Sequence, residues 1–295
     1  MTHTYKCLAI KTTYWRPHTN YTKKIIENIK GKIKNGDIVT ISEKAVSTAS
    51  GNIIDESKVN PTLLSHLIAK YWMRYSWGYP ISIVCHLRKN TIKRLRFYPI
   101  NEGATHKQVT LEHAGLWQTL MHGSEGAIDG SNLPYSYVSL PLKNAQHIAQ
   151  RIQEQIANEL HKNVAVMILD TDKTYSFRNF HFTPRPNPIN GIHAANGLPA
   201  YLTGRFLKLK QRATPIALVG NEIGVEEALV IADLANRARG FGAGRNVWDM
   251  AETFNVAITD VTWDMLDRVE HKPIVILRRV KASQSNKAKI RILSR

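Results

Sequence analysis

The fold of this chain is decided by residues 164–173, VAVMILDTDK. The first six of these residues form an unbroken apolar run, and two carboxylates, a hydroxyl and an amine follow it directly. An apolar run of this length predicts a strand that is buried on both faces. Asp170 and Thr171 are then expected where the strand ends, at the edge of a sheet. Open α/β folds collect their ligand and metal groups at such edges.

A second acidic tetrad, Asp129-Gly130-Ser131-Asn132, lies upstream of this strand. In a chain of formal net charge +17, hard oxygen ligands at Asp129 and Asp170 indicate a Mg²⁺ or Mn²⁺ site that holds phosphates. The alternative is that these two residues only cap turns or helices, because Asp-Gly and Ser-Asn are common turn residues. The pattern alone leaves both interpretations open.

The composition is that of an ordinary globular protein with ample length for a core: 295 residues, 43% hydrophobic and 21% charged. No apolar run approaches the length of a membrane span and no signal peptide is recognisable at the N-terminus, so we expect a cytoplasmic protein without a membrane partner. Cys7 and Cys85 lie in apolar runs, which favours buried thiols over a disulfide. No Cys/His cluster indicates structural zinc.

The excess of positive charge is clustered in residues 88–96 and 278–295. Such a field steers anionic small molecules or binds nucleic acid without sequence preference. A solvated basic surface explains it equally well. We expect one domain over residues 1–280, followed by a basic tail over residues 281–295.

Strand-like and helical patterns alternate along the chain, which predicts an α/β fold with a mixed sheet. The expected strands are residues 5–10, 37–41, 81–87, 138–140, 164–169, 215–219 and 273–277. The expected helices are residues 22–34, 61–74, 144–160 and 223–239. Residues 43–51 are expected to form a polar loop, and residues 99–136 a system of functional loops.

Several well-known catalytic motifs are absent, including the GxxxxGK[ST] phosphate loop, HExxH and GxSxG. A compact glycine run, Gly240-Phe241-Gly242-Ala243-Gly244-Arg245, follows the last expected helix. Its backbone N–H groups are suited to phosphate. A helix C-cap with a flexible loop behind it is the simpler explanation.

Four blocks of sequence resemble, in the right order, segments of the coenzyme F420-0:L-glutamate ligase (F420-0:gamma-glutamyl ligase) family. They are NGDIV leading into SEKAVSTASG at residues 35–51, GAIDGSN at 126–132, LDT at 169–171 with FRN at 177–179, and IADLA at 231–235. The resemblance covers about residues 36–244. It implies an α/β fold of two interleaved lobes and a homodimer.

The resemblance also implies an activity, namely GTP-dependent addition of L-glutamate to an anionic, deazaflavin-like acceptor such as coenzyme F420-0, through an acyl phosphate. Metal ions would bridge the phosphates. The implied metal ligands are Asp129, Asp170 and Thr171. The implied catalytic residues are Asp129, Asp170 and Arg178, and the implied nucleotide-site residues are Glu43, Lys44, Thr48, Asn132, Gly240, Gly242 and Gly244.

The chain departs from the family pattern at several of these positions. Thr48 replaces a lysine suited to phosphate, Glu43 a glutamine, and Lys173 a glycine. Phe241 stands where the family has a polar metal ligand. Three outcomes follow: an active ligase, a paralogue with another anionic acceptor, or a non-catalytic protein that binds an anionic cofactor or nucleic acid through its basic surface.

Overall fold

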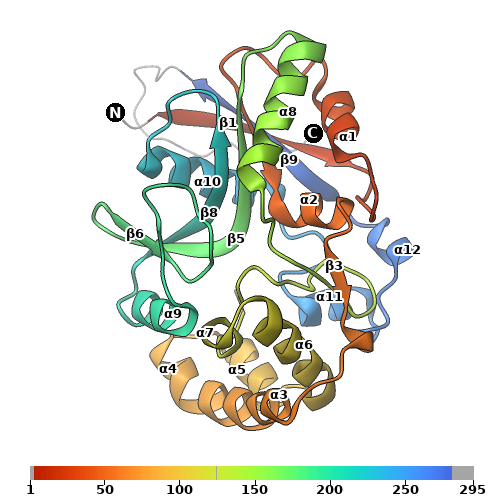
Figure 1. Ribbon diagram of the computed structural model, residues 1–295, viewed down its shortest axis with the longest axis vertical. Helices are drawn as coiled ribbons and strands as arrows, with labels where there is room; N and C mark the ends of the chain where they lie inside the picture. The colour runs from red at the N-terminus through yellow and green to blue at the C-terminus, as the bar shows by residue number, and fades with distance from the viewer. Residues whose placement is uncertain (1–2, 124, 281–295) are drawn as a thin grey trace.

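The computed structural model describes residues 3–123 and 125–280, and one large sheet dominates it (Figure 1). The strands are β1 (Thr4–Thr12), β2 (Ile38–Ser42), β3 (Ile53–Asp55), β4 (Tyr137–Ser139), β5 (Ala165–Phe177), β6 (Phe180–Thr183), β7 (His193–Ala194), β8 (Lys210–Val219) and β9 (His271–Val280). The large sheet has the order β1-β9-β2-β5-β6-β7, with β8 paired to β5. β2 and β5 run parallel, whereas β9 runs antiparallel to both β1 and β2. The expectation of a mixed sheet in an α/β architecture is confirmed.

Helices cover both faces of this sheet and form a separate group at its lower end (Figure 1). They are α1 (Tyr21–Ile29), α2 (Glu43–Ala49), η1 (Glu56–Lys58), α3 (Leu63–Leu67), the π-helix η2 (Ile68–Ile81), α4 (Ser82–Val84), α5 (Lys89–Arg96), α6 (Ile100–His113), α7 (Leu116–Thr119), α8 (Ala145–Leu160), α9 (Gly197–Phe206), α10 (Val225–Arg239), α11 (Val247–Phe254) and α12 (Trp263–Leu266). Among the described residues, no helix is long and apolar enough to cross a membrane.

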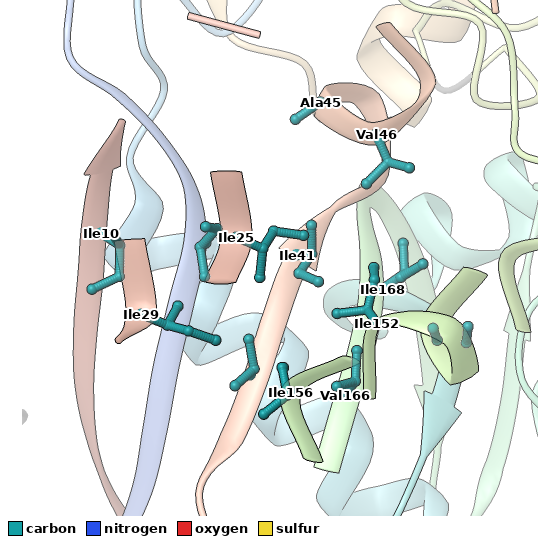
Figure 2. Close-up of a cluster of buried hydrophobic side chains, with 14 of the residues drawn as sticks. Ile10, Ile25, Ile29, Ile41, Ala45, Val46, Ile152, Ile156, Val166 and Ile168 are labelled. Atoms are coloured by element: carbon teal, nitrogen blue, oxygen red, sulfur yellow. The ribbon is translucent and has the colours of Figure 1, made fainter. Parts of the chain in front are cut away.

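Alternate residues of the central strands enter two different cores. Val166 and Ile168 of β5 pack with α1, α2 and α8 in the cluster of Figure 2. Ala165, Met167 and Leu169 face the opposite way and pack against α10. A strand between two apolar layers needs apolar side chains on both faces, which is why residues 164–169 form an unbroken run. Fully burying one such isoleucine contributes about 1.5–3 kcal/mol.

The strand over residues 164–169 is longer than expected. β5 continues to Phe177, and Asp170 lies in its middle. Two features still make Asp170 an edge residue. The parallel neighbour β2 ends opposite Leu169, and the ladder with β8 slips between Asp170 and Lys173, so that Thr171 and Asp172 form a bulge. A bulge re-aims side chains that a regular strand would point alternately up and down.

Three expectations about the segments between these strands were wrong. Residues 43–51 are mostly the helix α2, residues 81–87 contain the end of η2 and α4 instead of a strand, and residues 99–136 begin with the helix α6. The helices α3 to α7 and η2 build a third core around Met73, Trp77, Leu95 and Tyr98. The chain thus leaves the sheet after α2, forms this helical lobe, and returns at α8. The basic tail, residues 281–295, lies outside the described residues.

Both cysteines are free thiols, as expected. Cys7 lies in β1 and is half-buried, while Cys85 is fully buried directly after α4.

A buried charge cluster ties the helical lobe together. His106 of α6 contacts Glu56 of η1 through Nδ1 at 2.7 Å and Glu125 through Nε2 at 3.1 Å. Lys107 Nζ lies 2.9 Å from the other oxygen of Glu125 and donates to the Met121 carbonyl. Burial alone would lower the pKa of His106, but the charges of Glu56 and Glu125 raise it to about 10. Burial would raise the pKa of Glu125, but Lys107 and His106 lower it to about 2.

These shifts predict a pH window for stability. The contribution of His106 is complete below its ordinary pKa of 6.5 and is lost as pH rises to about 10, because a raised pKa favours the folded state only while the imidazole is charged there. The free-energy difference between wild type and His106→Gln, measured by urea unfolding, should therefore shrink over this range. The exposed His147→Gln variant is the control. A difference that stays constant with pH would contradict the charged pairing of His106.

Candidate functional site

A single cavity of about 800 Å³ lies where the sheet edge meets the helical lobe. It gathers most of the residues singled out from the sequence. Lining it are Lys44, Thr48, Asp129, Asn132, Asp170, Thr171, Gly240, Gly242 and Gly244. Glu43 lies directly behind the wall and is 3% exposed. The two acidic tetrads, with 37 residues of sequence between them (133–169), therefore face the same cavity.

Arg185 joins the two parts of the sheet edge. Its Nη1 lies 2.6 Å from Glu43 Oε2 and 3.0 Å from Asp170 Oδ2, and its Nη2 donates to Glu43 Oε1 at 3.1 Å. The arginine is 1% exposed. Glu43 is the first residue of α2 and also accepts a hydrogen bond from the Leu142 N–H. One guanidinium thus holds the start of α2 and the bulge of β5 together.

The pKa of Glu43 results from opposing effects of burial and neighbouring charges. Burial raises the pKa of Glu43, Arg185 opposes this, and the nearby charge of Asp170 adds to the rise. The pKa of Arg185 is raised above its ordinary value by the two carboxylates, although burial acts the other way. Arg185 therefore stays charged and neutralises a site that holds two acids.

Lys44 neutralises the carboxylate of the other tetrad, as Arg185 does for Asp170. Its ammonium binds Asp129 Oδ2 and donates to the carbonyl and hydroxyl oxygens of Ser131 at 2.8 and 2.7 Å. Asp129 Oδ1 accepts from the Ser131 N–H at 2.7 Å, which closes a tight turn. Burial would raise the pKa of Asp129, but Lys44 outweighs it and the pKa lies below its ordinary value. Asp129 is thus a carboxylate at neutral pH.

Asn132 connects this tetrad to the glycine run. Its Nδ2 donates to the Phe241 and Gly244 carbonyls at 3.2 and 2.9 Å, and its Oδ1 accepts from the Ala243 N–H at 2.7 Å. Gly242 has φ +58, and a Cβ there would lie 2.5 Å from Asn132 Oδ1. Glycine is needed at this position because a larger residue would strain the backbone and push the amide away. The family resemblance implies that Asn132 contacts the nucleotide. In the structure, its side-chain amide is instead hydrogen-bonded to the glycine run.

Two more cations line the cavity between the tetrads. Arg239, the last residue of α10, donates to Asn236 Oδ1 at 3.0 Å. Burial lowers its pKa, and the charges of Asp170 and Asp129 both act against this, so the guanidinium lies within electrostatic range of both tetrads. Lys173 follows the β5 bulge. Its pKa is likewise lowered by burial and supported by nearby carboxylates, Asp170 among them.

The structure does not bring Arg178 to this site. Arg178 occupies the turn between β5 and β6 with φ +53, and its guanidinium lies over the Phe177 ring. Eight residue steps of about 3.3 Å along the strand separate it from Asp170 by up to roughly 26 Å. The proposed catalytic role of Arg178 has no support from this position. Arg185 is the arginine that meets Asp170.

Little in the sequence pointed to Arg185 and Arg239. Arg185 lies between Pro184 and Pro186, and paired prolines hold the backbone extended, which presents the side chain in a fixed direction. That local rigidity was the one available signal. Arg239 resembles any basic residue in the last turn of a helix, where the helix dipole favours it.

The donor set suits a divalent cation that is held jointly with phosphates. Asp129 and Asp170 each retain acceptor capacity beyond their present partners, since a carboxylate has about four lone-pair sites. Thr171 lies next to them, with its N–H donating to Asp170 Oδ1 at 2.6 Å. No group of three His, Cys, Asp or Glu among the described residues forms a closed cage. Mg²⁺ needs none, because it uses one or two carboxylates together with water and phosphate oxygens.

Removing Arg185 should destabilise the protein strongly. Arg185→Met leaves two buried carboxylates without a cation, which typically costs about 3–5 kcal/mol. Adding Glu43→Gln should recover part of this loss, so the two effects are not additive. Unfolding in denaturant measures the free energies, and Arg178→Met, an exposed arginine, should change little. Equal losses for Arg185→Met and Arg178→Met would refute the bridging role.

Two comparisons with known proteins identify the family of this chain. Residues 9–239 match the family described as F420-0:Gamma-glutamyl ligase. The chain is also similar to the uncharacterized protein MJ1361 of Methanocaldococcus jannaschii, with 36% identity over 285 residues, 92% of this chain and 96% of the relative. The matched region contains both acidic tetrads, Arg185 and Arg239. This chain belongs to the F420-0:gamma-glutamyl ligase family, whose name is that of a glutamate ligase.

Proposed function

We propose that this protein is a GTP- and divalent-metal-dependent ligase that forms an amide bond between L-glutamate and an anionic acceptor, coenzyme F420-0 or a related compound. The observation that carries the proposal is the meeting of Asp129 and Asp170 in one cavity. The family supports glutamate ligation. We further propose that the protein acts in the cytoplasm, where GTP is available, and that it forms a homodimer.

The chemistry requires two successive transfers. A carboxylate oxygen of the acceptor attacks the γ-phosphorus of GTP, and the bond to the β-phosphate oxygen breaks to give an acyl phosphate and GDP. The amine of glutamate then attacks the acyl carbon, loses its proton, and phosphate leaves. Charge neutralisation and positioning account for most of the rate enhancement in such reactions.

The residues of the cavity divide these tasks. Asp129, Asp170 and Thr171 would hold Mg²⁺ or Mn²⁺, which would supply charge neutralisation to the phosphates. Lys173, in the tetrad that begins at Asp170, and Arg239 supply positive charge close to the carboxylates. Lys173 and Thr48 line the same cavity, so this cation would compensate for the lysine that Thr48 replaces. The glycine run, held by Asn132, presents backbone N–H groups to the nucleotide.

A calorimetric titration tests the nucleotide and metal parts. GTP with Mn²⁺ should bind wild type and bind Asp170→Asn at least about tenfold more weakly, since loss of ligand support typically costs 10–100-fold in metal affinity. Asp260→Asn, an exposed acid outside the cavity, is the matched control. Absence of metal-dependent GTP binding to wild type would sink the proposal.

A second assay separates catalysis from binding. GDP and phosphate release should require both L-glutamate and the acceptor, and Lys173→Met should slow it while the fold stays intact. A protein that binds GTP with metal but releases no phosphate with any anionic acceptor would be a non-catalytic member of the family.

A further inference from the structure

An unusual row of exposed apolar side chains runs along α3, η2 and α4, at the end of the molecule opposite α8 in Figure 1. We call it the apolar stripe. It comprises Leu63, Leu67, Tyr71, Tyr75, Tyr79 and Ile83. These residues recur at every fourth position, so a helix with about four residues per turn keeps them on one face. Leu63 is 76% exposed, Tyr75 61% and Ile83 69%.

The stripe faces away from the protein's own core. The opposite side of η2 carries Met73 and Trp77, which are both 0% exposed and anchor the helical lobe. Phe97, 74% exposed, extends the apolar character to the end of α5. A contiguous apolar surface of this kind marks an interaction site, because single exposed apolar residues are common and ordered rows are not.

The segment that carries the stripe has charges of one sign, and one of its cations, Arg94, pairs with Asp249 and Glu252 of α11. Residues 59–101 contain seven Lys and Arg and neither Asp nor Glu. Lys70 Nζ lies 5.1 Å from the centre of the Tyr71 ring, and Arg96 Cζ lies 4.3 Å from that of Tyr79. These two cations therefore border the stripe directly. Arg88, Lys89 and Lys93 add further exposed positive charge on the neighbouring α5.

We propose that the apolar stripe and its cationic border dock the protein peripherally on an anionic lipid surface, which revises the expectation of no membrane partner without requiring a membrane span. Leucine and isoleucine side chains would enter the boundary between headgroups and acyl chains, and tyrosine rings would lie at headgroup level. Lysine and arginine would reach the lipid phosphates with their stems along the apolar surface. The inference is independent of the proposed ligase activity.

Two other occupants fit the observations less well. A second copy of the chain would bring together two faces that both carry positive charge without an acid to match it. Single-stranded nucleic acid would match the charge, but the aliphatic residues Leu63, Leu67 and Ile83 offer bases no aromatic plane to stack on. Lipid is the partner that uses both the aliphatic side chains and the cations.

Docking would also orient the cavity. α3 carries Leu63 and Leu67 on the stripe, whereas His66 of the same helix lines the cavity. The wall of the cavity and the docking face therefore share one short helix. Lipid contact would hold this side of the cavity next to the membrane surface.

Co-sedimentation with vesicles tests the proposal. The full chain should bind vesicles of phosphatidylcholine mixed with phosphatidylglycerol and remain in solution with phosphatidylcholine alone. Lys89→Glu with Lys93→Glu should weaken binding at least about 25-fold, since each cation near an anionic surface contributes about fivefold. Lys143→Glu with Lys208→Glu, exposed lysines elsewhere, should have a much smaller effect.

A second set of variants tests the apolar part. Leu63→Gln, Leu67→Gln and Tyr75→Gln together should abolish vesicle binding without changing the thermal unfolding temperature, because these positions are exposed. Phe206→Gln with Leu207→Gln, equally exposed near the end of α9, is the control. Three results would overturn the proposal: no binding to anionic vesicles, a dimer that these substitutions dissociate, or oligonucleotide binding that they remove while vesicle binding persists.

Discussion

The buried contact of Arg185 with Glu43 and Asp170 is the constraint on which the site depends. Two carboxylates at a sheet edge would repel each other, and their burial would raise the cost of charge on both. One planar guanidinium compensates for the charge of both carboxylates because it binds both at once. An ammonium cannot bind two carboxylates with the same planar geometry. The start of α2, the β5 bulge and the segment around Arg185 are thereby fixed relative to each other. The relative positions of these three segments set the shape of the cavity.

The parts of the fold that could be predicted are those with a strong local pattern. The run at residues 164–169 indicated a doubly covered strand because both faces of β5 are apolar layers. The helix α8 kept its apolar face on Ile152 and Ile156, and α10 ends at Gly240 as expected. The two tetrads were predicted to converge, and they line the same cavity.

The failures share a physical cause, which is that tertiary context decided between local alternatives. Residues 81–87 are apolar and β-branched, so periodicity could not separate a strand from a helix, and the preceding π-helix carried the chain on as helix. The helix α2 was predicted as a loop because small polar residues favour loops in exposed segments. In this fold, Ser47 and Thr48 are buried. Arg178 was implied by the family resemblance, but β5 continues past its bulge to Phe177 and places Arg178 in the turn beyond it.

The position of β9 has a consequence for the order in which the protein is made. This last strand of the described chain lies between β1 and β2, and pairs Leu277 with Ile38 across most of the sequence. During synthesis the first two strands emerge early and must wait for residues 271–280 before they are joined. Pairing between strands so far apart in sequence slows folding, because the chain loses the conformational entropy of closing the loop before the strand contacts compensate for it. A nascent chain that lacks β9 therefore has an incomplete cavity, because His271, Lys272 and Pro273 of this strand form part of its wall.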